Sequence, residues 1–150
     1  MQKSTFEAIL AAQRSSKEIY CHTITAADID NGTAELTNGF FIILVTNGTV
    51  AISDTYSFEA GARDLMLLTP SMRVTFTDID DTLSMICLGI DPDYFDSLRD
   101  GQAMYAQLSR FIRECGYPLL HTSPEEFDCL RRTLELFLSA ADNLDFGRNA

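Results

Sequence analysis

Side chains that could carry catalytic or metal chemistry are few in this sequence, and their spacing matches no familiar site. The two histidines, His22 and His121, have neither a second histidine nor a carboxylate at a metal-ligand spacing. The acidic run at 78–81 lacks the glycine and distal glutamate of an EF-hand loop, so we interpret it as a solvated turn between strands. No Gly-x-Ser-x-Gly, Ser-x-x-Lys or glycine-rich phosphate loop occurs. The sequence therefore predicts no catalytic residue, no metal and no cofactor.

The same residues have structural interpretations. We expect His22 to be a surface or barrel-wall residue of a strand, and His121 to lie in a loop or cap before a helix. The four cysteines are widely spaced and include no Cys-x-x-Cys pair, which favours buried or half-buried reduced thiols over a zinc or redox site. They are Cys21, Cys87, Cys115 and Cys129.

Composition narrows the class of protein further. The chain has 150 residues, enough for one domain, and its 11 Lys and Arg against 22 Asp and Glu give a net charge of −11. Because nucleic-acid affinity depends largely on cations that meet phosphates, we expect no DNA or RNA binding by these residues. No signal peptide begins the chain and no apolar run approaches the roughly 20 residues of a membrane span, so we expect a cytoplasmic protein without a membrane partner.

The elements that would position these residues change type along the chain. Residues 1–18 predict an N-terminal arm with a short helix that carries Phe6, Ile9, Leu10 and Gln13, and residues 91–146 have helical spacing. Between them, residues 19–90 alternate short β-rich runs with turns, which predicts a small barrel or jelly roll and disfavours a parallel α/β sheet. The expected strands are 19–25, 40–46, 49–53, 55–58, 65–68, 73–77 and 83–88.

The strongest turn signal is Asn47-Gly48, which predicts a tight type I′ hairpin with Thr46 opposite Thr49. This register puts one set of side chains on one face and a second set on the other. The first set is Phe41, Ile43, Val45, Val50 and Ile52, and the second is Phe40, Ile42, Leu44, Ala51 and Ser53. Because both faces of the first strand are apolar, we expect it to be covered on both sides.

Three helices are expected after the strands: one capped by Asp91-Pro92, one over Met104–Cys115 that ends at Gly116, and one that begins at Ser123-Pro124-Glu125-Glu126 with a capping box. The last helix carries a narrow apolar seam over 127–144. Two partners are open for this seam: the Met104–Cys115 helix, in an antiparallel helical hairpin, or the same helix of a second subunit. The candidate dimer residues are Phe127, Leu130, Leu134, Phe137, Leu138 and Ala141.

Two stretches carry a family resemblance. The run Asp64-Leu65-Met66-Leu67-Leu68-Thr69-Pro70, and the 83–88 strand that leads into Asp91-Pro92-Asp93-Tyr94-Phe95, resemble the N-terminal domain of AraC-family transcription regulators, best over residues 38–98. The resemblance implies a cupin-like double-stranded β-helix (jelly-roll) barrel, followed by helices that pack on it and dimerise. Arg63 stands where the family has glycine, and Val74 and Thr75 stand where cupins commonly have histidine. Apolar Phe41 and Ile43, or their neighbours, replace the His-x-His of metal-holding cupins.

The resemblance also implies a function: an effector-sensing homodimer that reaches DNA only through a C-terminal helix-turn-helix domain absent from this chain. Strand alternation and the family's pocket suggest a barrel lining with Arg73 as a cation at the rim; plain core packing is the alternative for each residue. The lining is Phe41, Ile43, Met66, Leu68, Arg73, Val74, Phe76 and Met85. The rival classes are a stand-alone metal-free cupin that binds or interacts, and a cupin enzyme, which would need a metal.

Overall fold

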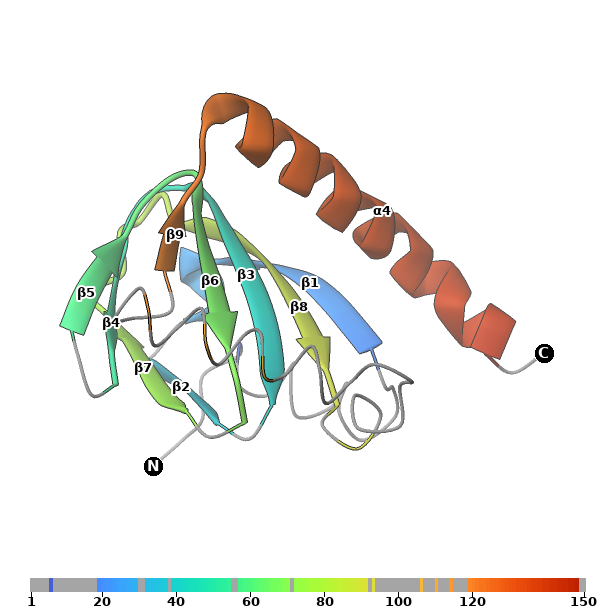
Figure 1. Cartoon of the computed structure of the whole chain (residues 1–150), viewed down its shortest axis with the longest axis horizontal. Helices are drawn as coiled ribbons and strands as arrows, with labels where there is room; N and C mark the ends of the chain where they lie inside the picture. The colour runs from blue at the N-terminus through green and yellow to red at the C-terminus, as the bar shows by residue number, and fades with distance from the viewer. Residues whose placement is uncertain are drawn as a thin grey trace.

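The computed structural model describes residues 6, 19–29, 32–37, 39–54, 57–70, 72–91, 93, 106, 110, 114 and 119–148, with helix side chains up to residue 139. Two antiparallel sheets face each other, and a long helix lies across the outer side of one of them (Figure 1). The elements are β1 (Ile19–Thr25), η1 (Ala26–Asp28), β2 (Ala34–Thr37), β3 (Phe40–Asn47), β4 (Val50–Ser53), β5 (Ser57–Ala60), β6 (Asp64–Leu68), β7 (Arg73–Thr77), β8 (Ser84–Ile90), β9 (Leu119–His121) and α4 (Pro124–Arg148).

The strand order identifies the barrel as a jelly roll. One sheet has the order β1-β8-β3-β6-β9 and the other has β2-β7-β4-β5. The chain changes sheet at every step from β1 to β4 and again from β5 to β8, which is the double Greek-key path of a jelly roll. The mainly β fold expected from the sequence is therefore confirmed. β1 and β7 have the expected bounds, whereas the short strands β2 and β9 were not predicted.

The predicted β3–β4 hairpin is wrong. β3 pairs with β6 and β8, while β4 pairs with β5 and β7 in the other sheet, so Thr46 and Thr49 are not cross-strand partners. Asn47-Gly48 instead carries the chain from one sheet to the other. Gly48 has a φ of +76°, and the Asn47 side chain donates to the Thr82 carbonyl at 2.9 Å, which fixes this corner against the start of β8. The predicted sidedness still holds, because both strands keep the same residues toward the space between the sheets.

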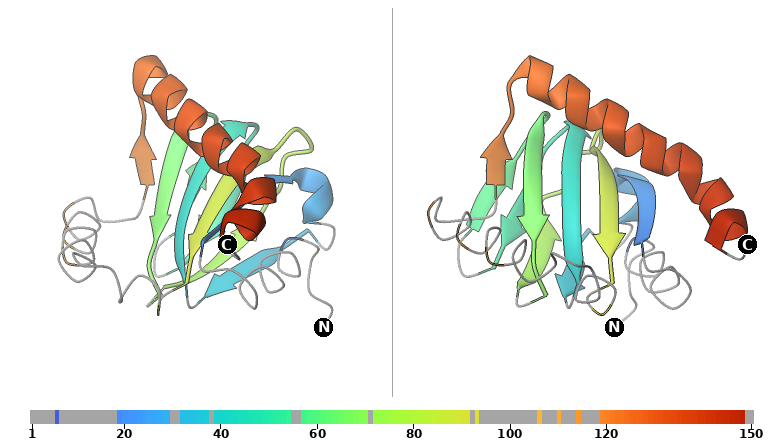
Figure 2. Two further views of the ribbon diagram at one scale, coloured as in Figure 1. Left: turned by 90° about the vertical axis from the view of Figure 1, so that its right-hand side faces the viewer. Right: turned by 45° about the vertical axis from the view of Figure 1, so that its right-hand side comes forward.

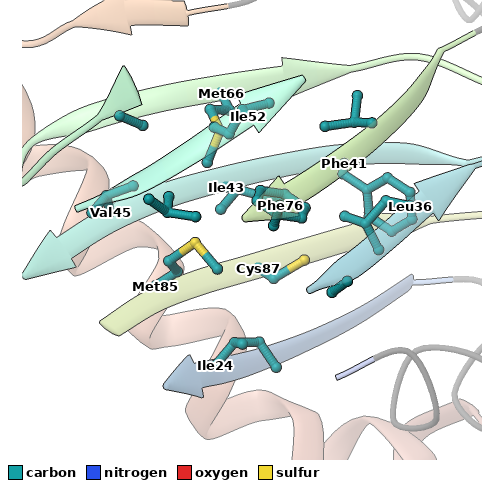
Figure 3. Close-up of a cluster of buried hydrophobic side chains, with 14 of the residues drawn as sticks. Ile24, Leu36, Phe41, Ile43, Val45, Ile52, Met66, Phe76, Met85 and Cys87 are labelled. Atoms are coloured by element: carbon teal, nitrogen blue, oxygen red, sulfur yellow. The ribbon is translucent and has the colours of Figure 1, made fainter. Parts of the chain in front are cut away.

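That space is filled by an inner cluster of buried apolar side chains from both sheets (Figure 3). Its members are Phe6, Tyr20, Ile24, Ile29, Ala34, Leu36, Phe41, Ile43, Val45, Val50, Ile52, Ala60, Met66, Leu68, Val74, Phe76, Leu83, Met85, Cys87 and Leu119. Glu35 of β2 and the alternate residues of β7, which are Arg73, Thr75 and Thr77, face outward and are polar, as expected for a sheet with one face toward water. On this side of the barrel, strand alternation separates the interior from solvent.

The outer face of the five-stranded sheet carries a second, outer cluster beneath α4, which runs diagonally over that face to β1 (Figures 1 and 2). Its buried members are Cys21, Leu44, Leu65, Ile86, Leu88 and Leu134, with Phe127, Leu130, Phe137 and Leu138 half-buried against them. The seam of α4 therefore packs on a sheet of its own chain. This arrangement does not support the helical hairpin, and the expected Met104–Cys115 helix lies outside the described residues apart from three positions.

The start of α4 matches the sequence prediction. The backbone N–H of Glu126 donates to Ser123 Oγ at 3.1 Å, and the backbone N–H of Ser123 donates to Glu126 Oε1 at 2.9 Å, which completes the capping box. These hydrogen bonds hold the pKa of the Glu126 carboxyl below its ordinary value. At the earlier predicted cap, the backbone N–H of Asp93 donates to Asp91 Oδ2 at 3.1 Å; the rest of that expected helix, and the N-terminal helix apart from Phe6, lie outside the described residues.

Candidate functional site

The candidate site is the interior of the barrel. Seven of the eight predicted lining residues belong to the inner cluster, and each is at most 3% exposed: Phe41, Ile43, Met66, Leu68, Val74, Phe76 and Met85. They come from four strands. β3, β6 and β8 belong to the five-stranded sheet and β7 belongs to the four-stranded sheet, so side chains from both sheets pack together in the interior (Figure 3). The structure brings these residues together as predicted; that they contact a ligand stays a prediction.

Arg73 is the exception. Its side chain is 75% exposed and lies on the outer face of β7, where its Nε is 3.4 Å from Glu35 Oε1 on β2. It alternates with Val74, which points inward, so the predicted rim cation faces away from the interior. Strand parity could have placed it correctly, since Arg73 differs by an odd number of residues from both Val74 and Phe76.

Sequence reasoning missed one residue that the structure places in the inner cluster. Phe6 has helical backbone and belongs to neither sheet, yet its side chain is completely buried in the inner cluster. Its ring centroid lies 5.9 Å from that of Phe76, with 53° between the ring planes, which is a favourable tilted arrangement. The apolar spacing around Phe6 was visible in the sequence, but nothing in it indicated that the Phe6 side chain is buried in the inner cluster.

The positions at which the resemblance to cupins would place metal ligands include apolar side chains that point into this interior. Phe41 and Ile43 lie on β3 and Val74 lies on β7, all of them in the inner cluster. Within the described part of the chain, no three His, Cys, Asp or Glu side chains lie close enough together to hold a metal ion. The side chains of these described residues therefore do not fit a mononuclear cupin metal centre.

The second histidine has a role that the sequence did not predict. His121 lies in strand β9, not in a loop. Its cross-strand partner is Asp64 of β6, and its Nδ1 is 2.5 Å from Asp64 Oδ1. The buried Asp64 carboxylate also accepts the backbone N–H of Gly61 at 2.8 Å. Together these contacts fasten β9 and the start of α4 to the edge of the sheet. His22 lies on β1 between Tyr20 and Ile24 and is half-buried, in keeping with a barrel-wall position.

Arg63 has an unusual backbone conformation at this corner. Its φ is +78°, in the left-handed region that favours glycine. The Arg63 N–H donates to the Val45 carbonyl at 2.8 Å, and its own carbonyl accepts the backbone N–H of Thr122 at 3.3 Å and the Thr122 hydroxyl. The surrounding hydrogen bonds thus hold an arginine in a backbone conformation that costs it energy.

We expect Arg63→Gly to make the domain more stable by about 1 kcal/mol, because it removes the steric cost of a left-handed non-glycine residue. Urea unfolding monitored by circular dichroism would measure this. Arg63→Ala is the matched control: it removes the same charged side chain but keeps the strain, so it should give no gain. Equal stabilisation by both variants would show that the side chain, not the backbone, was responsible.

The remaining candidate groups are accounted for structurally. Asp80 accepts hydrogen bonds from the backbone N–H and the hydroxyl of Thr82, which lower the pKa of its carboxyl, so the acidic run is the solvated turn that was predicted. Burial raises the pKa of the Cys21 thiol to about 11 and also raises the pKa of the fully buried Cys87, which favours the protonated thiol over the nucleophilic thiolate at both positions. Cys129 is exposed, contrary to expectation, and Cys115 lies outside the described residues.

Comparison with known proteins gives similarity of structure only. No family model matches the sequence, and no curated protein matches it. The structure neighbours are ToxT, an AraC-family regulator, and proteins of the cupin fold. One structure of ToxT from Vibrio cholerae is 12% identical to this chain, with a TM-score of 0.46. The match covers 88% of this chain and 56% of the ToxT chain.

Another ToxT structure, from Vibrio cholerae O395, is bound to (E)-4-(8-methylnaphthalen-1-yl)but-3-enoic acid; it is 14% identical with a TM-score of 0.46, over 79% of this chain and 47% of that one. The EutQ protein of Clostridium difficile is 18% identical with a TM-score of 0.41, over 54% of this chain and 63% of that one. The jelly-roll assignment follows from the strand order of this chain. In addition, no helix within the described residues is long and apolar enough to cross a membrane.

Proposed function

We propose that this domain is the effector-sensing and dimerisation domain of an AraC-type transcription regulator. It binds a small molecule in the barrel and so controls a DNA-binding domain outside these 150 residues, in the cytoplasm. The observation that carries the proposal is the interior of the barrel: the two sheets of a jelly roll enclose buried side chains that are almost all apolar, at the positions where the resemblance to cupins would place metal ligands.

The charge of the chain supports the proposal that this domain senses the effector while another domain contacts DNA. The net charge of −11 opposes binding to phosphates, and the long stretch from Glu18 to Ala62 has no Lys or Arg. DNA contact therefore belongs to another domain, and this one changes the placement of that domain when it binds its effector. The sequence run at Asp64–Pro70 and the left-handed Arg63 support the AraC type, since the family requires glycine-like backbone at that position.

Helix α4 is the proposed dimerisation element. Of the six candidate dimer residues, Leu134 is 4% exposed against the sheet, four others are half-buried, and the Ala141 side chain lies outside the described part of the chain. The surface of α4 that is free for a partner is the opposite one, where Leu136 is 70% exposed. We therefore place the proposed dimer contact on the outward side of α4 around Leu136 and on the half-buried seam residues next to it.

The alternatives make different predictions. A metal-free cupin that serves only as an interaction protein would dimerise without responding to any small molecule. A cupin enzyme would need a metal, and stoichiometric iron, manganese or zinc in purified protein would favour it over the sensing role.

The test fuses the chain to a DNA-binding domain that represses a reporter only as a dimer. We expect repression with the wild-type chain, loss of repression with Leu136→Asp, and a shift in repression when an effector is added. Sedimentation velocity on the isolated chain checks the dimer directly. A monomer at all concentrations together with a silent reporter would refute the proposal.

A further inference from the structure

We propose that the paired strands β6 and β9 carry a change in the packing of the barrel interior to helix α4, and that the pair formed by Asp64 and His121 is the joint between them. This inference rests on the proposed sensing function and adds to it the route by which the interior controls the proposed dimerisation helix. It starts from the place of β9, which lies beside β6 at the edge of the five-stranded sheet and leads directly into α4 (Figure 2).

The two strands reach the interior through one pair of side chains. Leu119 of β9 is 6% exposed, and its cross-strand partner Met66 is completely buried; both belong to the inner cluster. Among the described strands, β9 pairs with β6 alone, and β6 joins the rest of the sheet only through β3. An edge that is held on one side yields more readily than a central strand, so a change in packing around Met66 displaces this edge first.

The next pair on the same face of this ladder is polar. Asp64 and His121 are cross-strand partners two residues further along, and His121 Nδ1 lies 2.5 Å from Asp64 Oδ1. Asp64 is 7% exposed, and its other carboxylate oxygen accepts the Gly61 N–H at 2.8 Å, which fixes the direction of the carboxylate. The end of β9 is therefore fastened to the start of β6 by a side-chain contact as well as by the backbone ladder.

The link from this pair to α4 has no slack. Thr122 and Ser123 alone separate β9 from α4, and both are held. The backbone N–H and the hydroxyl of Thr122 donate to the Arg63 carbonyl, directly before β6, and Ser123 is fixed by its capping box with Glu126. The start of α4 therefore follows the start of β6 when packing in the interior shifts that strand.

The length of α4 enlarges a small shift. A helix of 25 residues is about 37 Å long, and α4 runs diagonally from the β9 edge to β1 (Figure 1). A tilt of a few degrees at its start moves its far half by a few ångströms, because the helix behaves as a rod. The outward surface around Leu136 moves with it, so the proposed dimer contact responds to the barrel interior.

The experiment compares Met66→Ala with Met85→Ala. Both methionines are completely buried in the inner cluster, but Met85 lies on β8, two strands away from β6. The readout is hydrogen exchange, by NMR, of the backbone amides of Thr122 and Phe127, which bond to Arg63 and Ser123 and so report the link and the first turn of α4. We expect Met66→Ala to accelerate both amides at least fivefold and Met85→Ala to change them less than twofold, because amides at the end of an element exchange through local opening and not through global unfolding.

A double-mutant comparison tests the joint itself. With His121→Ala the pair is lost, so adding Met66→Ala should accelerate the two amides less than twofold further. His121→Asn places an amide nitrogen where the imidazole has Nδ1 and should restore the fivefold response, whereas His121→Leu only fills the space and should not. Should Met66→Ala not fold, Met66→Leu and Met85→Leu give the same ranking with smaller changes.

Four outcomes would overturn the inference: equal acceleration by Met66→Ala and Met85→Ala, no acceleration by either, a full response to Met66→Ala that persists with His121→Ala, or a response that His121→Leu restores and His121→Asn does not. The experiment uses the whole chain without an effector. A silent reporter fusion would therefore refute the sensing function and leave this coupling standing, whereas unchanged Thr122 and Phe127 amides would refute the coupling and leave sensing to another route.

Discussion

Leu134→Asp is expected to lower the free energy of unfolding by about 3 kcal/mol or more, at every protein concentration, because it places a carboxylate without a counter-ion between α4 and the sheet. Leu134 is 4% exposed and packs in the outer cluster with Leu44 and Ile86, and its backbone carbonyl lies 3.8 Å from the Cys21 thiol. The loss of stability would thus come from within one chain. Urea unfolding at two protein concentrations tenfold apart measures it.

Leu136→Asp is the matched control, on the same helix and two residues further along. Its side chain is 70% exposed, so the free energy of unfolding of the monomer should change by less than about 0.5 kcal/mol. Any effect of this variant should appear in sedimentation as a weaker dimer. If Leu134→Asp instead keeps full stability and only dissociates a dimer, then the seam of α4 meets a second subunit and not the sheet.

The second large effect is expected at the corner between the two sheets. Gly48→Ala should cost about 3 kcal/mol or more, from two sources that add. A non-glycine residue at a φ of +76° is strained by about 1–2 kcal/mol. In addition, its Cβ would lie 2.7 Å from the backbone N and Cα of Leu83, which cannot move aside without displacing the start of β8.

Gly32→Ala separates the two sources. Gly32 has the same φ of +76°, but a Cβ there would meet nothing within 4 Å. It should therefore cost only the backbone strain, about 1 kcal/mol, and the difference between the two variants measures the contact at the corner. Equal costs would show that the loop before β8 yields easily and that Asn47-Gly48 does not fix the relation of the sheets. Thermal and urea unfolding of both variants check the prediction.

Local sequence patterns predicted most of the barrel strands. Seven of the eight residues predicted to line the barrel do point inward, and the exception is Arg73. β7 alternates clearly because only one of its faces is buried, whereas β3 and β6 are continuous apolar runs because the opposite sheet covers one face and α4 the other. β2 and β9 were missed since each contributes only one or two inward residues, too few to make a pattern; Leu119 is the single inward residue of β9. The capping box at Ser123 was predicted correctly because all of its hydrogen bonds are local.

What the sequence did not reveal is which segments meet. An Asn-Gly turn has the same local chemistry whether the strands on either side pair or pass to different sheets, so the hairpin interpretation failed at Gly48. A seam of apolar residues on a helix predicts that this face is buried, but it does not predict which element packs against it. For α4 that element is the five-stranded sheet. The burial of Phe6 between the sheets is likewise a long-range contact that no window of sequence contains.

The exchange of strands between the sheets also sets the order in which the chain can fold. Among the described strands, β4 and β5 alone pair with their neighbour in sequence; β1 ends at Thr25, yet its partner β8 begins at Ser84. Such long-range pairing raises contact order and slows folding to milliseconds or seconds, because loops must close before contacts stabilise them. During synthesis, β3 therefore has no hydrogen-bonded neighbour strand until β6 has been made, and β1 has none until β8 has been made. The partly synthesised chain exposes β3, its most apolar strand. We therefore expect this domain to fold late and to depend on chaperones when it is synthesised rapidly.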